Sequence, residues 1–425
     1  MKKSLVLLLL SACQASAPVP MMEDAATQSD DGGAPVEQDS GPGPDASQPP
    51  GPMPIGLAVV SGDIDYKATS LSLIDPATRT VTKADCLTSG TTAPELSLAL
   101  SGDVALPSHS FTHNSVVLID RGNSTLTWVN PASCAPVAQL AVGTGFAANP
   151  HDLIEVSAKK LYLTRSDMNA MPSGTMDQGD DILIIDPTSK QITGRIDLHG
   201  QADIVNGAPI QARPDRGLQI DGKVYVTLTH ASLDFKTFGS GKIVVIDGAT
   251  DQVTTSIAVD PYKNCSGLDY VPASKTLYVA CNGDYSSIDQ ASQSAIVTID
   301  LSGATPVLGK LTLPSQVALR PLSKDAISAD GSRVFSISAG NFGNTTDIVW
   351  SYDIGQGKST KLLTGDDSFI LGFTAIDRTR NQLYVTDASA NKPVVHVFQL
   401  TSGDSQELPA LSPSSKMLPR QIGWY

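Results

Sequence analysis

The sequence predicts an all-β fold for most of this 425-residue chain. Hydrophobic residues make up 41% of it, enough for a core, whereas aromatic residues make up 5%, and there are 35 glycines and 28 prolines. This balance favours many short strands and turns over long helices. The other two observations are a repeat with a period of about 50 residues after Pro54 and four short strand-like segments in each copy.

The repeat is clearest in the middle of the chain. One copy has apolar segments at residues 161–164 (Leu-Tyr-Leu-Thr), 182–186 (Ile-Leu-Ile-Ile-Asp) and 191–196. The same order returns at 224–227, 243–247 and 253–257, and again at 277–280, 296–300 and 306–311. Weaker copies pair 334–337 with 348–350 and 383–386 with 394–397. Four-stranded antiparallel units at this period are typical of a β-propeller, in which each blade packs against its neighbours.

The recurring Leu-Tyr-Val-Thr and Val-Ile-Asp elements resemble the YVTN repeat family, whose members are seven-bladed propellers. The resemblance spans residues 55–425 and is strongest in three or four copies. Among the N-terminal copies, residues 71–75 fit well, but 129–131 (Val-Asn-Pro) stand where Ile-Asp is expected. The resemblance implies a fold more than a function, because the repeat residues build blades.

Ring closure is also predicted from the sequence. The first strand, at residues 56–60, matches the second strand of a repeat, so the first blade lacks its innermost strand. The C-terminal residues 418–425 resemble the innermost-strand segments at 149–154 and 213–218. We therefore expect the C-terminal strand to complete blade one, which leaves no open sheet edge.

The N-terminus has the features of an export signal. Two lysines precede a short apolar run, which is far shorter than the roughly 20 residues of a membrane-spanning helix. Leu10-Ser11-Ala12-Cys13 resembles the bacterial lipobox, which implies cleavage of residues 1–12 and acylation of Cys13. The alternative is a secretory signal cut elsewhere, which leaves Cys13 as a stray thiol or discards it. Gln14 resembles the outer-membrane sorting pattern of enterobacterial lipoproteins.

Residues 13–54 are predicted to be a disordered tether. Beyond the cysteine they are rich in Asp, Ser, Gly, Ala and Pro and contain no Lys or Arg. Such a segment has too little apolar surface to offset its chain entropy. We expect a lipid-anchored protein of the cell envelope, with the lipid bilayer as a partner through acylated Cys13 and the 55–425 domain beyond the tether.

Four further cysteines are expected to form two disulfides, since exported proteins meet an oxidising environment. Cys265 and Cys281 flank the turn near Pro272 almost symmetrically, which places them opposite each other on adjacent antiparallel strands. Cys86 and Cys134 lie near the outer strands of the first two blades, where a bridge would join neighbouring blades beside the closure.

Several classes of function find no support. The net charge of −14 argues against a nucleic-acid partner, and no nucleophile elbow, phosphate-binding loop or metal-binding Cys or His motif is present. His109 and His113 are interpreted as ordinary surface or loop histidines, and the loop acids as solvated. No metal or other cofactor is expected.

One recurring aspartate per repeat is expected to shape a turn: Asp75, Asp186, Asp247, Asp300 and Asp353.

The candidate site is a set of cations at the start of the innermost strands. These residues are His151, Arg213, Arg216, Arg320, Lys324 and Arg420. Strand starts converge on the mouth of a propeller's channel, so we predict a basic cluster that binds an anionic group or ligand. The alternative is salt bridging to the nearby Asp152, Asp215 and Asp325.

The leading functional hypothesis is a monomeric, non-catalytic binding or scaffold module. Its long, acidic loops between second and third strands share one face, which would recognise a protein, peptide or glycan. The rival hypothesis is an enzyme, because propellers resembling this one include lactonases and other hydrolases. A buried carboxylate and His pair converging at the channel mouth would favour the enzyme, and only salt-bridged Arg and Asp would favour binding.

Overall fold

The computed structural model describes residues 55–111, 114–284, 287, 289–311, 322–340 and 345–425. They belong to one compact unit, Pro50–Tyr425. The predicted signal peptide, Cys13 and the tether lie outside the described residues, as do His113 and Arg320. In this part of the chain no helix is both long and apolar enough to cross a membrane.

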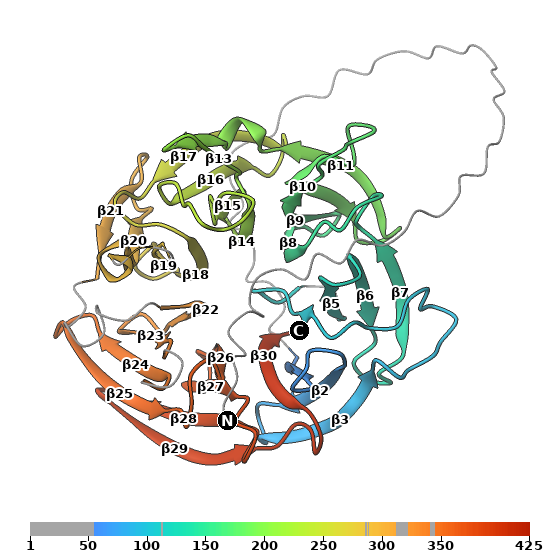
Figure 1. Ribbon diagram of the computed structural model, residues 1–425. Helices are drawn as coiled ribbons and strands as arrows, with labels where there is room; N and C mark the ends of the chain where they lie inside the picture. Colours follow the sequence, from blue (N-terminus) through green and yellow to red (C-terminus); the bar gives the residue numbers. More distant parts are fainter. Residues whose placement is uncertain (1–54, 112–113, 285–286, 288, 312–321, 341–344) are drawn as a thin grey trace, which may run out of the picture. The chain divides into compact units, whose positions relative to one another are not determined.

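Seven four-stranded antiparallel sheets form the blades of a propeller, as predicted (Figure 1). Blade one contains β30 (Leu418–Trp424), β1 (Leu57–Gly62), β2 (Thr69–Asp75) and β3 (Thr80–Thr88). Blade two contains β4 (Val104–Ala105), β5 (Val116–Asp120), β6 (Thr125–Val129) and β7 (Pro136–Ala141). Blade three contains β8 (Pro150–Ser157), β9 (Lys160–Met168), β10 (Gly179–Asp186) and β11 (Gln191–Asp197). Each list runs from the innermost strand outward.

The other four blades follow the same order. Blade four contains β14 (Pro214–Ile220), β15 (Lys223–Leu228), β16 (Lys242–Asp247) and β17 (Gln252–Ala258). Blade five contains β18 (Cys265–Val271), β19 (Thr276–Asn282), β20 (Ser294–Asp300) and β21 (Val307–Lys310). Blade six contains β22 (Leu322–Ala329), β23 (Arg333–Ser338), β24 (Ile348–Asp353) and β25 (Lys358–Thr364). Blade seven contains β26 (Leu371–Asp377), β27 (Gln382–Asp387), β28 (Val394–Thr401) and β29 (Asp404–Leu411).

Short elements occupy two of the connections. The helical turn η1 (His199–Gln201) and the hairpin of β12 (Asp203–Val205) and β13 (Ala208–Ile210) lie between blades three and four. A second helical turn, η2 (Gln290–Gln293), precedes β20. Because neighbouring strands in a blade are antiparallel, the loops between second and third strands share one face with the connections between blades. We call this the loop face, and the opposite one the turn face.

The predicted ring closure is confirmed. Strand β30 pairs with β1 from Leu57 opposite Trp424 to Gly62 opposite Leu418. The two ends of the propeller therefore share one sheet, in which β30 covers the inner edge of β1 and is itself the innermost strand.

Burial follows position within the blade. The second strand of blade seven, β27, is buried along its whole length, whereas the outermost strand β17 of blade four is largely exposed. A middle strand has a neighbouring blade on each face, so both of its side-chain rows are apolar or hydrogen-bonded. The core consequently lies between blades, and one cluster joins Val245 of blade four to Leu277 of blade five.

Both predicted disulfides are present. Cys86 of β3 is bonded to Cys134, which precedes β7, so this bridge links blades one and two. Cys265 and Cys281 face each other across β18 and β19, with a Cα–Cα distance of 3.9 Å.

The recurring aspartates are confirmed as turn residues. Each one accepts a backbone N–H two or three residues further on, for example from Thr188 to Asp186 at 2.7 Å and from Ala249 to Asp247 at 2.9 Å. The others are Asp75, Asp300 and Asp353. The backbone N–H of Thr188 is the main reason that the pKa of Asp186 is lowered.

Two buried aspartates join consecutive blades. Asp180 of blade three accepts the N–H groups of Ala212 and Arg213, which lead into blade four. Asp347 precedes β24 of blade six and accepts four backbone N–H groups, three of them from residues that lead into or begin blade seven. These carboxylates fix the position at which each following blade begins.

A histidine in blade seven lies between two carboxylates. His396 of β28 places Nδ1 2.8 Å from Glu407 Oε1 and Nε2 3.1 Å from Asp387 Oδ2. Burial acts to lower the pKa of His396, but the two hydrogen-bonded carboxylates outweigh it and leave the pKa raised. The charged imidazolium is therefore stabilised in the folded state.

Candidate functional site

The channel between the innermost strands contains a segment of the chain itself. Strand β4 is only two residues long, and residues 106–109, which follow it, enter the channel; we call them the channel segment. The N–H of Leu106 donates to Gln421 Oε1 at 2.8 Å, and its carbonyl accepts from Arg216 at 3.2 Å. The N–H of Ser108 donates to Asp152 at 2.8 Å. Blades one, four and three thus hold this segment through buried side chains.

A cavity of about 90 Å³ lies between the channel segment and the innermost strands of blades five, six, seven and one. Its polar lining includes His109, Arg216, Asp269, Ser328, Thr374, Arg378 and Gln421, and its aromatic lining is Phe373 and Trp424. Asp269, Ser328 and Trp424 lie in the second half of their innermost strands, and Arg378 follows the end of β26. The cavity therefore extends toward the turn face and includes only Arg216 among the described residues of the predicted site.

His109 lies in a loop, one of the two sequence-based interpretations, but it faces the channel rather than the outer surface. It lines the cavity, and its Nε2 is buried without a hydrogen-bond partner among the described residues. Burial lowers the pKa of His109 to about 4; of the nearby charges, Asp269 acts to raise it, whereas Arg378 and Arg216 lower it further. The imidazole is neutral at pH 7.

Arg216 is the one described member of the predicted basic set that lines the cavity. Its guanidinium lies 3.8 Å from both Asp152 and Asp215, and it also donates to the His151 carbonyl at 3.0 Å. His151 Nδ1 lies 2.8 Å from Asp215 Oδ1. The alternative expectation, salt bridging to Asp152 and Asp215, is thus what the structure shows for Arg216, and His151 is hydrogen-bonded to Asp215.

Asp152 is fully buried and has a structural role. Its carboxylate accepts the N–H groups of Ser108 and Gly217, at 2.8 and 2.9 Å, and so links three blades. Burial raises the pKa of Asp152 to about 6, against the opposing effects of Arg216 and these amides.

Arg213 does not join a cluster on the channel axis. It is 1% exposed, donates to Asp167 at 2.6 Å and to the carbonyl of Leu233 at 3.3 Å, and its guanidinium carbon lies 4.1 Å from the ring centroid of Phe235. The chain enters β14 with Arg213 at a φ of 51°, and this backbone geometry is part of what aims the side chain at the loop.

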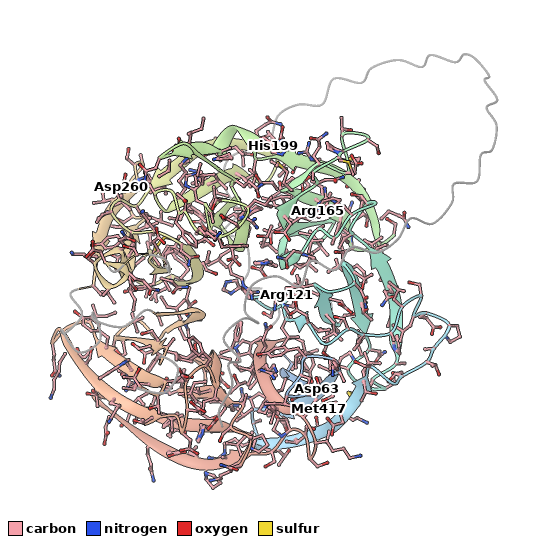
Figure 2. All side chains as sticks on the ribbon, in the orientation of Figure 1. Asp63, Arg121, Arg165, His199, Asp260 and Met417 are labelled. Atoms are coloured by element: carbon pink, nitrogen blue, oxygen red, sulfur yellow. A yellow bond between two sulfur atoms is a disulfide. The ribbon has the colours of Figure 1, made fainter. Side chains whose placement is uncertain are left out.

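Arg420 is also directed to a loop. Its guanidinium carbon lies 3.7 Å from the ring centroid of Tyr66, and it donates to the Tyr66 hydroxyl and, at 2.8 Å, to the carbonyl of Asp63, which Figure 2 labels on blade one. The described cations of the predicted set are therefore divided among three separate groups of partners. Arg320 lies outside the described residues, and only the backbone of Lys324, in β22, is described.

Sequence reasoning missed the residues around the cavity. Gln421, Asp269 and Arg378 look like ordinary strand and turn residues, and nothing in their spacing marks them. The one available signal was that the second repeat departs from the pattern. In that blade β4 ends after two residues, so the channel segment leaves the sheet and enters the channel.

Comparisons with known proteins support the fold. No family model matches the chain, and no curated protein matches it. Among solved structures, a putative 6-phosphogluconolactonase from Bacteroides fragilis has a TM-score of 0.56 and 10% identity over 89% of this chain and 100% of that one. The periplasmic gluconolactonase PpgL of Pseudomonas aeruginosa gives 0.52 and 12% over 87% and 98%. The β-propeller domain of Cps50 (Swd1) from Myceliophteria thermophila gives 0.51 and 11% over 81% and 98%. At these identities the likeness concerns the fold alone.

Proposed function

We propose that this protein is a lipid-anchored, extracytoplasmic binding module whose loop face recognises a partner protein without catalysis. Three aromatic residues of that face carry the proposal: Tyr66, Phe235 and Phe369. Each has a φ in the left-handed region, 56°, 54° and 61°. For a bulky side chain this conformation costs on the order of 1–3 kcal/mol and tends to occur at functional sites.

Each of these aromatic residues is held by a neighbouring charged group. Arg420 stacks on Tyr66, Arg213 stacks on Phe235, and Asp347 accepts the N–H of Phe369 at 2.9 Å. The predicted site arginines thus act here as supports for loop residues. Loops that are ordered before binding lose less entropy when a partner arrives.

The same face exposes other large apolar side chains. Tyr66 and Phe369 are 54% and 46% exposed, and Met171 and Leu233 stand out from the loops of blades three and four. Single exposed apolar residues are common, but several of them on the loops of one face are characteristic of a protein-binding surface. Aromatic anchors contribute strongly to such interfaces.

The cellular location in this proposal rests on the N-terminal sequence and the cysteines. The lipobox-like residues precede an acidic tether, and the two disulfides suit an oxidising compartment. Outer-membrane sorting remains part of the proposal through Gln14 alone.

Site-specific photo-crosslinking in the source cells tests the proposal. A photoreactive residue would replace Met171 or Leu233 in the full-length chain, and Val307 of β21, 62% exposed on an outer strand, would be the control position. We expect one common adduct from the two loop positions and none from Val307. Tyr66→Ala and Phe369→Ala should each reduce that adduct, whereas equal crosslinking from all three positions would contradict the proposal.

One observation favours the alternative, a hydrolytic enzyme at the channel mouth. His151 and Asp215 form a hydrogen-bonded pair, and Asp215 also accepts from Thr229 at 3.0 Å. A histidine oriented by a buried carboxylate is a common general base. Hydrolysis of simple sugar lactones that is lost in His151→Ala would establish this alternative.

A further inference from the structure

The cavity beside the channel segment has an uneven supply of hydrogen-bonding groups. Its carboxylate, amide and hydroxyl acceptors are already occupied by donors of the protein, whereas His109 Nε2 has no partner among the described residues. Asp269 accepts from the N–H groups of Tyr270 and Ala329 and from Arg378. Gln421 Oε1 accepts from the N–H of Leu106. The hydroxyls of Ser328 and Thr374 are hydrogen-bonded to each other at 2.9 Å.

Several donors in the lining have no such partner. Because a backbone N–H fixes Gln421 Oε1 as the acceptor, the orientation of this amide is determined, and its Nε2 carries two further N–H groups. Arg378 donates through Nε to the Ala329 carbonyl and through Nη2 to Asp269, which leaves Nη1. Within the described part of the chain, neither Nη1 of Arg378, Nε2 of Gln421 nor Nε1 of Trp424 donates to a protein acceptor.

Arg378 and Gln421 come from two different blades and line one cavity, whereas Trp424, three residues beyond Gln421 in a regular stretch of β30, lies on the other face of that strand. Arg378 follows β26 and is 43% exposed, so it lies where the cavity opens. Gln421 and Trp424 belong to β30, and Gln421 is buried. A volume of about 90 Å³ holds several water molecules or one molecule of a few heavy atoms.

We propose that this cavity binds a small carboxylate, which accepts hydrogen bonds from Arg378 and Gln421. A carboxylate offers about four lone-pair sites and no donor, which complements a lining whose carboxylate, amide and hydroxyl acceptors are occupied. The guanidinium adds a charge-assisted hydrogen bond, the stronger kind. This ligand is independent of the partner proposed for the loop face.

Calorimetric titration of the full-length protein with acetate and with acetamide tests the proposal. The two probes have the same shape, but only acetate lacks a donor and carries a charge. We expect acetate to bind at millimolar concentration and acetamide to bind at least tenfold more weakly. Equal binding of both probes, or no heat with either, would overturn the proposal.

Gln421→Glu is the most informative variant. It keeps the oxygen that accepts from Leu106 but replaces the free amide with a second oxygen, so acetate affinity should fall at least tenfold. Gln139→Glu is the matched control, because Gln139 Oε1 also accepts a backbone N–H, at 2.9 Å from Leu98, on outer strand β7. It should bind acetate like the parent.

Arg378→Gln provides a second variant should Gln421→Glu fail to fold. It removes the charged guanidinium of a side chain that is 43% exposed, and acetate affinity should fall at least tenfold. Unchanged affinity in a folded Gln421→Glu protein, or in Arg378→Gln where the first variant does not fold, would refute the assignment of the site.

Discussion

Asp347 offers a sharp test of how the loop face is held in place. Its carboxylate is 1% exposed and accepts four backbone N–H groups, from Gly340, Phe369, Ile370 and Leu371, at 2.7 to 2.9 Å. Asp347→Ala removes every one of these acceptors. The variant should loosen the start of blade seven and the backbone of Phe369 together.

The magnitude depends on which donors can reach water afterwards. The bonds from Gly340 and Leu371 are buried, whereas those from Phe369 and Ile370 are partly exposed. A buried donor left without a partner costs about 1–3 kcal/mol, so the two buried ones should together lower the free energy of unfolding by about 4 kcal/mol. At the usual unfolding entropy per residue, the melting temperature of a propeller of this size should then be about 5 °C lower than that of the parent protein.

Asp353→Ala is the matched control at the other end of β24. Its carboxylate accepts one exposed N–H, from Gln356, so truncation should change the free energy of unfolding by less than about 1 kcal/mol. Thermal melts followed by circular dichroism would compare the two variants with the parent. Equal melting temperatures for Asp347→Ala and Asp353→Ala would refute the reasoning.

Further predictions concern the anchor, the supports of the loops and pH. Cys13→Ala should move the protein from the membrane fraction to the soluble fraction, and mass spectrometry of the mature parent should find acyl chains on Cys13; an unmodified N-terminus elsewhere would contradict this. Arg213→Ala should lower the free energy of unfolding by about 3 kcal/mol, because Arg213 is buried and paired, whereas Arg121→Ala, from a half-exposed pair, should cost less than about 1 kcal/mol in denaturant titrations. The raised pKa of His396 adds stability that is fully present below its unfolded value near 6.5 and is lost as the pH rises through the folded value. His396→Gln should abolish this part of the pH dependence of unfolding, and an unaltered profile would exclude the assignment.

The repeat made the fold predictable, because each copy has the same alternation of buried strands and turns. Asp186 and Asp247 could be assigned to turns because their role depends only on neighbouring residues. The pairing of Cys265 with Cys281 followed from an antiparallel hairpin for the same reason. Local geometry of this kind is largely determined by the sequence around it.

The site was predicted less well, because the position of a Cα atom does not give the direction of a long side chain. Arg213 and Arg420 were correctly placed at innermost strands, yet both extend to loop residues, Phe235 and Tyr66, that lie far from them in the sequence. The position of His109 depends on β4 ending after two residues. Such contacts are decided by packing between blades, which no local pattern encodes.

The two proposed sites lie at departures from the repeat, where local rules give way to specific interactions. The aromatic residues of the loop face are supported by Arg213, Arg420 and Asp347, whereas the cavity is built on the channel segment and opens beside Arg378 toward the turn face. Substitutions at two sites that share no contacting residues usually have additive effects on the free energy. Phe369→Ala should therefore leave acetate affinity unchanged, and Gln421→Glu should leave the loop-face adduct unchanged. Loss of both properties in either single variant would mean that the channel segment couples the two faces, and the two sites would then have to be treated as one.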